Sequence, residues 1–223
     1  MKRRRFIRTL ACGTAVLPLG AAALSNTRSI TILHTNDTHS RIDPFPEGHK
    51  RYSNKGGVAR RASLIKRIRE EEEQVLLLDA GDIFQGTPYF NLFGGELEMK
   101  LMSQMKYDAA TMGNHDFDAG IDGFLKVLPH ANFPFLCSNY DFGDTALNSK
   151  TQQHKVFQKG DLRIGVFGVG VELDGLVGKD LYGNTRYSDP ISCAQQQADL
   201  LRDELKCDLV ICLSHLGYFP RLN

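Results

Sequence analysis

The sequence predicts an α/β sandwich in which helices cover mostly parallel strands. Two observations lead to this class: short apolar runs alternate with amphipathic segments, and two strand-like runs are joined by a tight turn. Alternation of strands and helices is typical of parallel sheets, because each crossover brings a helix back over a sheet face. The chain has 223 residues, 42% of them hydrophobic, so we expect one domain with a substantial core.

The first predicted strand, residues 30–33, is a β-branched and apolar run that suits a sheet covered on both faces. The helix predicted over 57–74 has its apolar residues on one stripe and its charges outward, and a buried strand follows over 75–82. The alternation continues with a helix over 95–106, a strand over 107–113, a helix over 119–129 and a strand over 133–139.

The second half of the chain keeps the same rhythm. Residues 154–170 are predicted to form two strands joined by a turn at Lys159, Gly160 and Asp161. A helix follows over 189–206, with Asp189 placed to cap it and Pro190 at the first helical position, where an N–H has no helical partner in any case. A strand over 207–215 comes last.

The first 25 residues contain five basic residues and no acidic residue, followed by small and apolar residues. This layout predicts a signal peptide over residues 1–25. The run RRRFIR at residues 3–8 resembles the twin-arginine export signal, which implies the twin-arginine export machinery as a partner and a periplasmic or secreted location. A transmembrane anchor is the weaker interpretation, because the apolar stretch is short and is interrupted by two glycines and a proline.

Without that segment the chain has 22 basic and 26 acidic residues, a net charge of −4. Nucleic-acid binding needs a basic surface that neutralises phosphates, so we expect no nucleic acid as a partner. Four cysteines lie in the remaining part, Cys137, Cys193, Cys207 and Cys212. Free cysteine is commonly a small buried hydrophobe, and Cys137 and Cys212 lie in apolar runs, so buried thiols are expected rather than disulfides.

Polar clusters follow four of the predicted strands. They contain Asp37 and His39, then Asp79 and Asp82, then Asn114, His115 and Asp116, and finally His215. Because ligand sites gather beyond the carboxyl ends of strands in α/β sheets, we expect these side chains to lie together. Carboxylates, an amide and imidazoles suit a divalent transition-metal centre, in which one carboxylate bridges two ions. Each cluster alone is also compatible with a turn, and Asp79 is interpreted as a buried acceptor rather than a ligand.

The strings LHTNDTHS, DAGDIFQGTP, GNHDFD and LSHLGY occur in this order, and together they resemble the calcineurin-like metallophosphoesterases, specifically the secreted 5′-nucleotidase branch. The resemblance covers residues 29–220. It implies a layered α/β-β/α sandwich, two divalent metal ions such as Zn²⁺ or Mn²⁺, and hydrolysis of a nucleotide or another small phosphoester by metal-activated water. A cyclic-nucleotide phosphodiesterase or a nucleotide-sugar hydrolase on the same centre is the alternative.

The resemblance also implies a role for each matching residue. Five residues match metal ligands: Asp37 and His39 of the first ion, Asp82 bridging both ions, and Asn114 and His215 of the second. His115 matches a catalytic histidine that does not bind metal, with Asp116 as the carboxylate that orients it.

The family pattern continues with a strand ending in Gly-His-x-His and with a second domain that grips the nucleotide, and the 223 residues contain neither. We therefore expect residues 26–223 to be a partial phosphoesterase domain, incomplete at its C-terminal end, with a separate C-terminal nucleotide-binding domain as a possible partner. A truncated, non-catalytic remnant that binds metal weakly is the alternative interpretation.

Overall fold

A computed structural model describes residues 28–217. The strands are β1 (Thr31–Thr35), β2 (Val75–Asp79), β3 (Ala109–Ala110), β4 (Tyr140–Asp141), β5 (His154–Lys159), β6 (Leu162–Gly170), β7 (Arg186–Tyr187) and β8 (Leu209–His215). The helices are α1 (Val58–Glu71), α2 (Pro88–Phe93), α3 (Glu96–Gln104), α4 (Gly120–Val127), α5 (Lys179–Tyr182) and α6 (Pro190–Asp199). The short turns η1 (His115–Phe117) and η2 (Leu128–His130) are 3₁₀ helices, and η3 (Leu200–Glu204) continues α6 as a π-helix.

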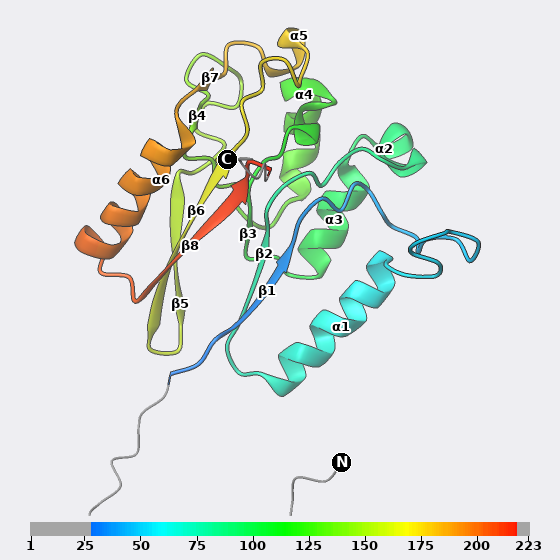
Figure 1. Cartoon of the computed structure of the whole chain (residues 1–223), viewed down its shortest axis with the longest axis horizontal. Coiled ribbons are helices and arrows are strands. Elements are labelled where there is room, and N and C mark those ends of the chain that lie inside the picture. The colour runs from blue at the N-terminus through cyan, green and yellow to red at the C-terminus, as the bar shows by residue number, and fades with distance from the viewer. Residues whose placement is uncertain (1–27, 218–223) are drawn as a thin grey trace, which may run out of the picture.

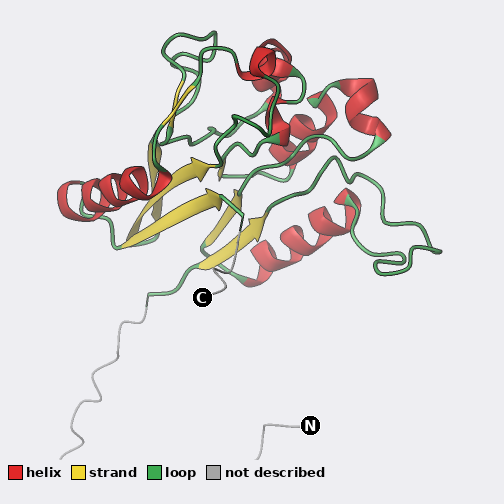
Figure 2. Ribbon diagram, turned by 45° about the horizontal axis from the view of Figure 1, so that its top comes forward, coloured by secondary structure: helices red, strands yellow, loops and turns green. Residues whose placement is uncertain are grey.

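Two three-stranded sheets form the centre of the molecule, with helices on their outer sides (Figures 1 and 2). The first sheet has the order β1-β2-β3 and is parallel, with Thr35 opposite Asp79. The second has the order β5-β6-β8: β5 and β6 form the predicted antiparallel hairpin, and β8 is parallel to β6. A small antiparallel pair, β4-β7, lies above them (Figure 1).

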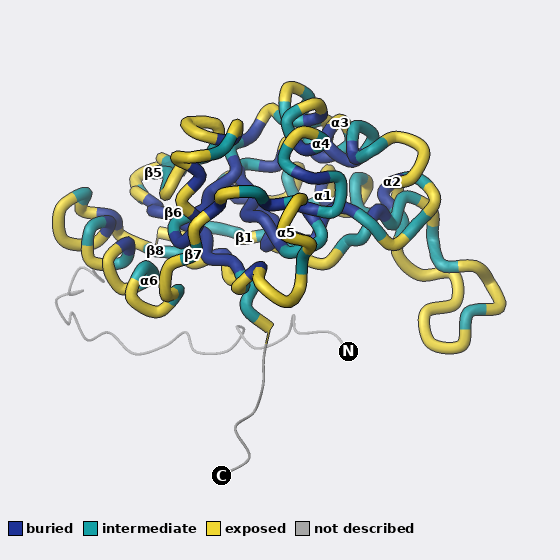
Figure 3. The backbone as a smooth tube through the Cα atoms, turned by 90° about the horizontal axis from the view of Figure 1, so that it is seen from above, coloured by how far each residue is buried: buried dark blue, intermediate teal, exposed yellow. Residues whose placement is uncertain are grey.

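The core shows how the layers are ordered. Leu76 and Leu78 of β2 belong to an apolar cluster with Val166 of the second sheet, whereas Leu77 belongs to a cluster with Met99 of α3. Alternate residues of a strand face opposite sides, so β2 lies between the second sheet and the helix layer. α6 covers the outer face of the second sheet, and the buried backbone runs through the middle of the molecule (Figure 3). The predicted layered α/β sandwich is confirmed.

One predicted strand is not regular. Residues 133–139 form only isolated bridges, from Phe135 to Ala110 and from Leu136 to Gln152. Pro134 has no N–H to donate, and the amide of Cys137 bonds to Gln152 rather than continuing along β3. The strand predicted over 107–113 is likewise reduced to the two residues of β3.

The four cysteines within residues 28–217 are free thiols. Cys137 and Cys207 are buried and Cys193 is half-buried, but Cys212 is exposed, so the prediction that Cys212 is buried is wrong. Alternate side chains of β8 face opposite sides: Leu213 packs between the sheets, and the neighbouring Cys212 therefore faces outward.

The predicted signal peptide lies outside the described residues. Within residues 28–217, no helix has both the length and the apolar character that crossing a membrane requires.

Candidate metal centre

The ends of three strands bring predicted site residues to one edge of the molecule. Asp37 and His39 lie on the loop after β1, Asp82 lies on the loop after β2, and His215 is the last residue of β8. The two loops run alongside each other, because the amide of Asp37 donates to the carbonyl of Gly81 (2.9 Å) and the amide of His39 to the carbonyl of Asp82 (3.0 Å). Both loops leave the parallel sheet at the same edge, where ligand sites are expected.

Asp82 is at the centre of this group. Its Oδ2 atom lies 3.7 Å from Nε2 of His39 and 3.2 Å from Nε2 of His215. Asp37 approaches His39 as well, with its Oδ1 atom 3.8 Å from the same Nε2. Ligand atoms of Asp37, His39 and Asp82 all lie within 4.8 Å of one another. The structure therefore brings four of the five predicted ligands together.

The two imidazoles are oriented by backbone carbonyls. Nδ1 of His39 lies 3.2 Å from the carbonyl oxygen of Phe84, and Nδ1 of His215 lies 2.7 Å from that of Ala80. A carbonyl only accepts hydrogen bonds, so each Nδ1 carries the hydrogen and each Nε2 is directed at Asp82. Metal-binding histidines in proteins are held in this way, and the donor set therefore fits a divalent cation.

Charge interactions inside the group are strong. Burial alone would raise the pKa of Asp82, but the hydrogen bond and the charge of His215 lower it below its ordinary value. Burial alone would lower the pKa of His215, but the hydrogen bond and the charge of Asp82 raise it to about 9. These shifts favour an ion pair between Asp82 and His215, and a cation that binds Nε2 of His215 would have to displace its proton.

The backbone of the ligand loops is strained. Asp37, His39 and Asp82 adopt positive φ angles of 48°, 44° and 56°, which cost on the order of 1–3 kcal/mol each and persist only where the surroundings impose them. At Gly81 a Cβ atom would lie 2.5 Å from the amide nitrogen of Gly113, so the loop after β2 approaches the Gly113 loop more closely than other residues permit.

His115 lies beside this group, on η1. Its ring centroid is 5.3 Å from that of His39, and its Nδ1 atom is 2.9 Å from Oδ2 of Asp118. Burial would lower the pKa of His115, but the Asp118 hydrogen bond and neighbouring carboxylates raise it. The side chain is 41% exposed and therefore accessible to a substrate. Asn114 directly precedes η1 on the same loop, and its assignment as a ligand stays a prediction.

The prediction that Asp116 orients His115 is wrong in this structure. The Asp116 side chain is fully buried, and its carboxylate accepts the backbone N–H groups of Asp82 (2.9 Å), Ile83 (2.9 Å), Phe84 (3.2 Å) and Gly113 (2.8 Å). In a 3₁₀ turn the residues i and i+3 share a face, which places Asp118 rather than Asp116 beside His115. In the sequence, the second acid of the string HDFD indicates this partner of His115.

Comparison with known proteins agrees with this geometry. Residues 30–221 match the calcineurin-like phosphoesterases. The chain belongs to this family. Snake venom 5′-nucleotidase of Crotalus adamanteus is 37% identical over 197 residues, which cover 85% of this chain and 33% of that protein. The solved structure of a 5′-nucleotidase precursor from Thermus thermophilus superposes with a TM-score of 0.77 at 32% identity, covering 85% of this chain and 37% of that one.

A third relative is the NAD nucleotidase of Haemophilus influenzae, whose structure superposes with a TM-score of 0.72 at 30% identity over 84% of this phosphoesterase chain and 34% of that protein. The chain thus spans about a third of the length of these relatives. Calcineurin-like phosphoesterases are hydrolases that use divalent metals, and Asp37, His39 and Asp82 form the candidate site for such a metal here.

Proposed function

We propose that the protein containing this chain is a dinuclear-metal phosphoester hydrolase of the 5′-nucleotidase type, which releases phosphate from nucleotides. One observation carries the proposal: Oδ2 of Asp82 is faced by the Nε2 atoms of two histidines from different strand ends, His39 and His215. A carboxylate approached from two sides by nitrogen donors suits a ligand shared by two ions.

In this proposal Asp37 and His39 would hold the first ion, Asp82 would be shared by both ions, and Asn114 and His215 would hold the second. Cations bound there would acidify a water and offset negative charge on the phosphoryl oxygens. The carbonyl groups of Phe84 and Ala80 keep the two ligand imidazoles in the required tautomer.

His115 is the group that handles the leaving oxygen. Asp118 accepts the hydrogen from Nδ1 of His115, so Nε2 is the nitrogen that faces the substrate. Water adds to phosphorus and gives up a proton to solvent, the bond to the nucleoside oxygen breaks, and protonated His115 donates its Nε2 proton to that oxygen. The raised pKa of His115 favours the protonated form that this step requires.

The similarity to an NAD nucleotidase favours a second substrate class, in which the bond broken lies within a pyrophosphate. Cyclic nucleotides and nucleotide sugars stay the alternative substrates that we propose for the same centre. A profile across a nucleoside 5′-monophosphate, a cyclic nucleotide, a nucleotide sugar and NAD separates these activities, because the ligand residues alone do not distinguish the leaving groups.

The test uses the full-length gene product with Mn²⁺ or Zn²⁺ and measures phosphate released from a nucleoside 5′-monophosphate. We expect metal-dependent turnover that His115→Gln lowers roughly 100-fold or more while metal content is unchanged. Absence of hydrolysis of every phosphoester in the profile by the metal-loaded protein would overturn the proposal and favour the non-catalytic remnant.

Export also stays a proposal. Residues 1–25 carry the features of a twin-arginine signal, and we propose a periplasmic or secreted location on that basis. Blocking export by replacing Arg3, Arg4 and Arg5 with lysine, followed by fractionation of the cells, tests it: retention in the cytoplasm is expected, and unchanged export would contradict it.

A further inference from the structure

A second buried carboxylate, Asp79, lies directly beneath the ligand loops. It is the last residue of β2, and its side chain is fully buried on the face that β2 presents to the helices. Its Oδ1 atom accepts the backbone N–H of Gly81 (2.9 Å), and its Oδ2 atom accepts the hydroxyl of Thr35 (2.6 Å). Thr35 is the last residue of β1 and lies opposite Asp79 in the sheet.

The hydrogen bonds of this cluster have a defined direction when Asp79 is ionised. The Thr35 hydroxyl has one hydrogen, which it donates to Asp79. The hydroxyl of Tyr107 lies 2.8 Å from the same Thr35 oxygen, so Tyr107 must be the donor there. Tyr107 is 4% exposed and belongs to the apolar cluster under the sheet. A chain therefore runs from the Tyr107 hydroxyl through Thr35 to Asp79.

We propose that Asp79 is a positioning residue that fastens the ends of β1 and β2 to each other and so sets the separation of the loops carrying Asp37, His39 and Asp82. The proposal rests on the proposed function only in treating those three residues as metal ligands. Asp79 contacts Gly81, which directly precedes Asp82, and Thr35, which lies two positions before Asp37. Neither contact is to a ligand side chain.

The hydrogen bonds of the Asp79 side chain add to backbone contacts between the two loops, in which the amides of Asp37 and His39 donate to the carbonyls of Gly81 and Asp82. The amide of Ala80 donates to the carbonyl of Thr35 (2.8 Å), and this bond continues the strand pairing. Immediately beyond it the chain turns into positive φ at Gly81 and Asp82, and at Asp37 on the other loop. Asp37 and Asp82 keep positive φ angles only where the surroundings impose them, and the hydrogen bond from the Gly81 amide to the Asp79 carboxylate fixes the residue that leads into Asp82.

Asp116 offers an internal comparison. Its carboxylate binds the N–H groups of Asp82 and Gly113, and so ties the loop after β2 to the loop that carries His115. Asp79 ties the same β2 loop to β1 instead. Loss of the Asp79 clamp should therefore loosen residues 35–40 and leave residues 113–118 protected.

The test is hydrogen–deuterium exchange of the chelator-treated full chain, read by mass spectrometry, with Thr35→Val and Thr35→Ser as a matched pair. Valine has the shape of threonine without the hydroxyl, whereas serine keeps the hydroxyl. We expect Thr35→Val to speed exchange in residues 35–40 about tenfold, Thr35→Ser to match the wild type, and residues 113–118 to be unchanged in both. Asp79→Asn is expected to act like Thr35→Val if it folds.

Equal exchange in the two Thr35 variants, or acceleration spread over the whole chain, would overturn the proposal. Calorimetric titration with Mn²⁺ adds a second readout: Thr35→Val should weaken binding about tenfold relative to Thr35→Ser. If the wild type binds neither Mn²⁺ nor Zn²⁺, the proposed function fails, and the exchange experiment still decides the role of Asp79. If the wild type binds Mn²⁺ and both variants bind it equally, the positioning role is wrong.

Discussion

Asp116 and Asp118 both follow His115, and replacing each with alanine should change a different property of the protein. The Asp116 side chain is fully buried and accepts four backbone N–H groups, from Asp82, Ile83, Phe84 and Gly113. The Asp118 side chain is 24% exposed and accepts from the His115 ring. We expect Asp116→Ala to destabilise the fold and Asp118→Ala to lower turnover in a protein of nearly unchanged stability.

The magnitude for Asp116→Ala follows from its contacts. Each buried donor left without an acceptor costs about 1–3 kcal/mol, so four cost about 4–12 kcal/mol. Burial raises the pKa of Asp116 from 3.8 to about 6, so removing the ionised group at pH 8 returns roughly 3 kcal/mol. The expected net loss is about 1–9 kcal/mol, whereas Asp118→Ala removes a partly exposed pair worth about 1 kcal/mol or less.

Urea unfolding of the metal-free protein at pH 8 measures the first effect. With a slope of about 2 kcal/mol per molar urea, a loss of about 4 kcal/mol lowers the midpoint by about 2 M. Phosphate release by the metal-loaded full-length protein measures the second, and Asp118→Ala should lower it roughly 100-fold. Equal midpoints for the two variants, or full turnover by Asp118→Ala, would refute this division of roles.

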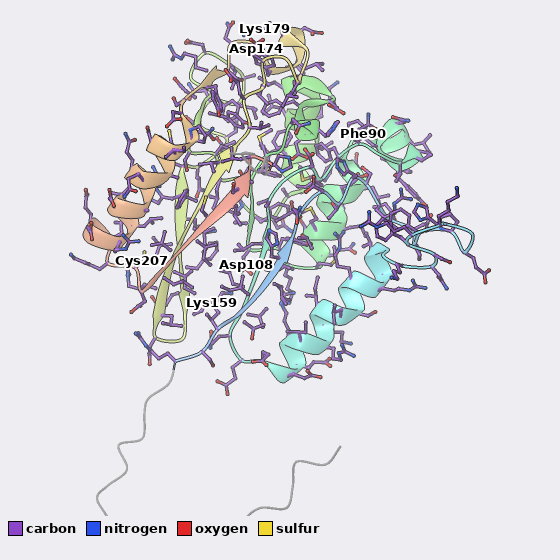
Figure 4. All side chains as sticks on the ribbon, viewed as in Figure 1. Phe90, Asp108, Lys159, Asp174, Lys179 and Cys207 are labelled. Carbon is purple, nitrogen blue, oxygen red and sulfur yellow. The ribbon has the colours of Figure 1, made fainter. Side chains whose placement is uncertain are left out.

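Three further predictions concern the metal centre and the sheets. Asp82→Ala should abolish binding of a metal pair, and calorimetry that still finds two Mn²⁺ per chain would contradict the bridging role. The pKa of His215 is raised to about 9, so metal binding below that pH releases a proton. The affinity for Mn²⁺ should therefore rise about tenfold per pH unit between about pH 6.5 and 8.5. An affinity measured by calorimetry that does not change with pH would rule this out. Asp108 accepts the amide of Leu77 (2.8 Å) and pairs with Lys159 (3.1 Å) near the base of the sheets (Figure 4). Asp108→Ala should therefore lower the free energy of unfolding by about 2–4 kcal/mol, against about 1 kcal/mol or less for Lys159→Met, both measured by urea unfolding.

The sequence predicted elements whose signal is local. The stripe of apolar residues in α1 and the cap of α6 are examples: the Asp189 carboxylate accepts the amide of Ser192, as the prediction requires. The segment 133–139 shows the opposite case. Its apolar residues resemble a strand, but its backbone amides bond to Ala110, to Gln152 and, at Ser138, to Gly168. Pairing with several separate segments is decided by tertiary contacts, which a hydrophobic pattern does not record.

In the candidate site, the sequence likewise predicts where a residue lies but not where its side chain points. A polar residue just after a buried strand is placed at the sheet edge by the topology alone, which is why Asp37, His39, Asp82 and His215 were predicted together. The direction of a side chain depends on the turn that follows. Within HDFD, the 3₁₀ turn η1 directs the acid at i+3 to His115 and the acid at i+1 into the core. We therefore expect the buried acid to hold the loops in place and the half-buried one to assist the proposed chemistry, although the two lie two positions apart in the sequence.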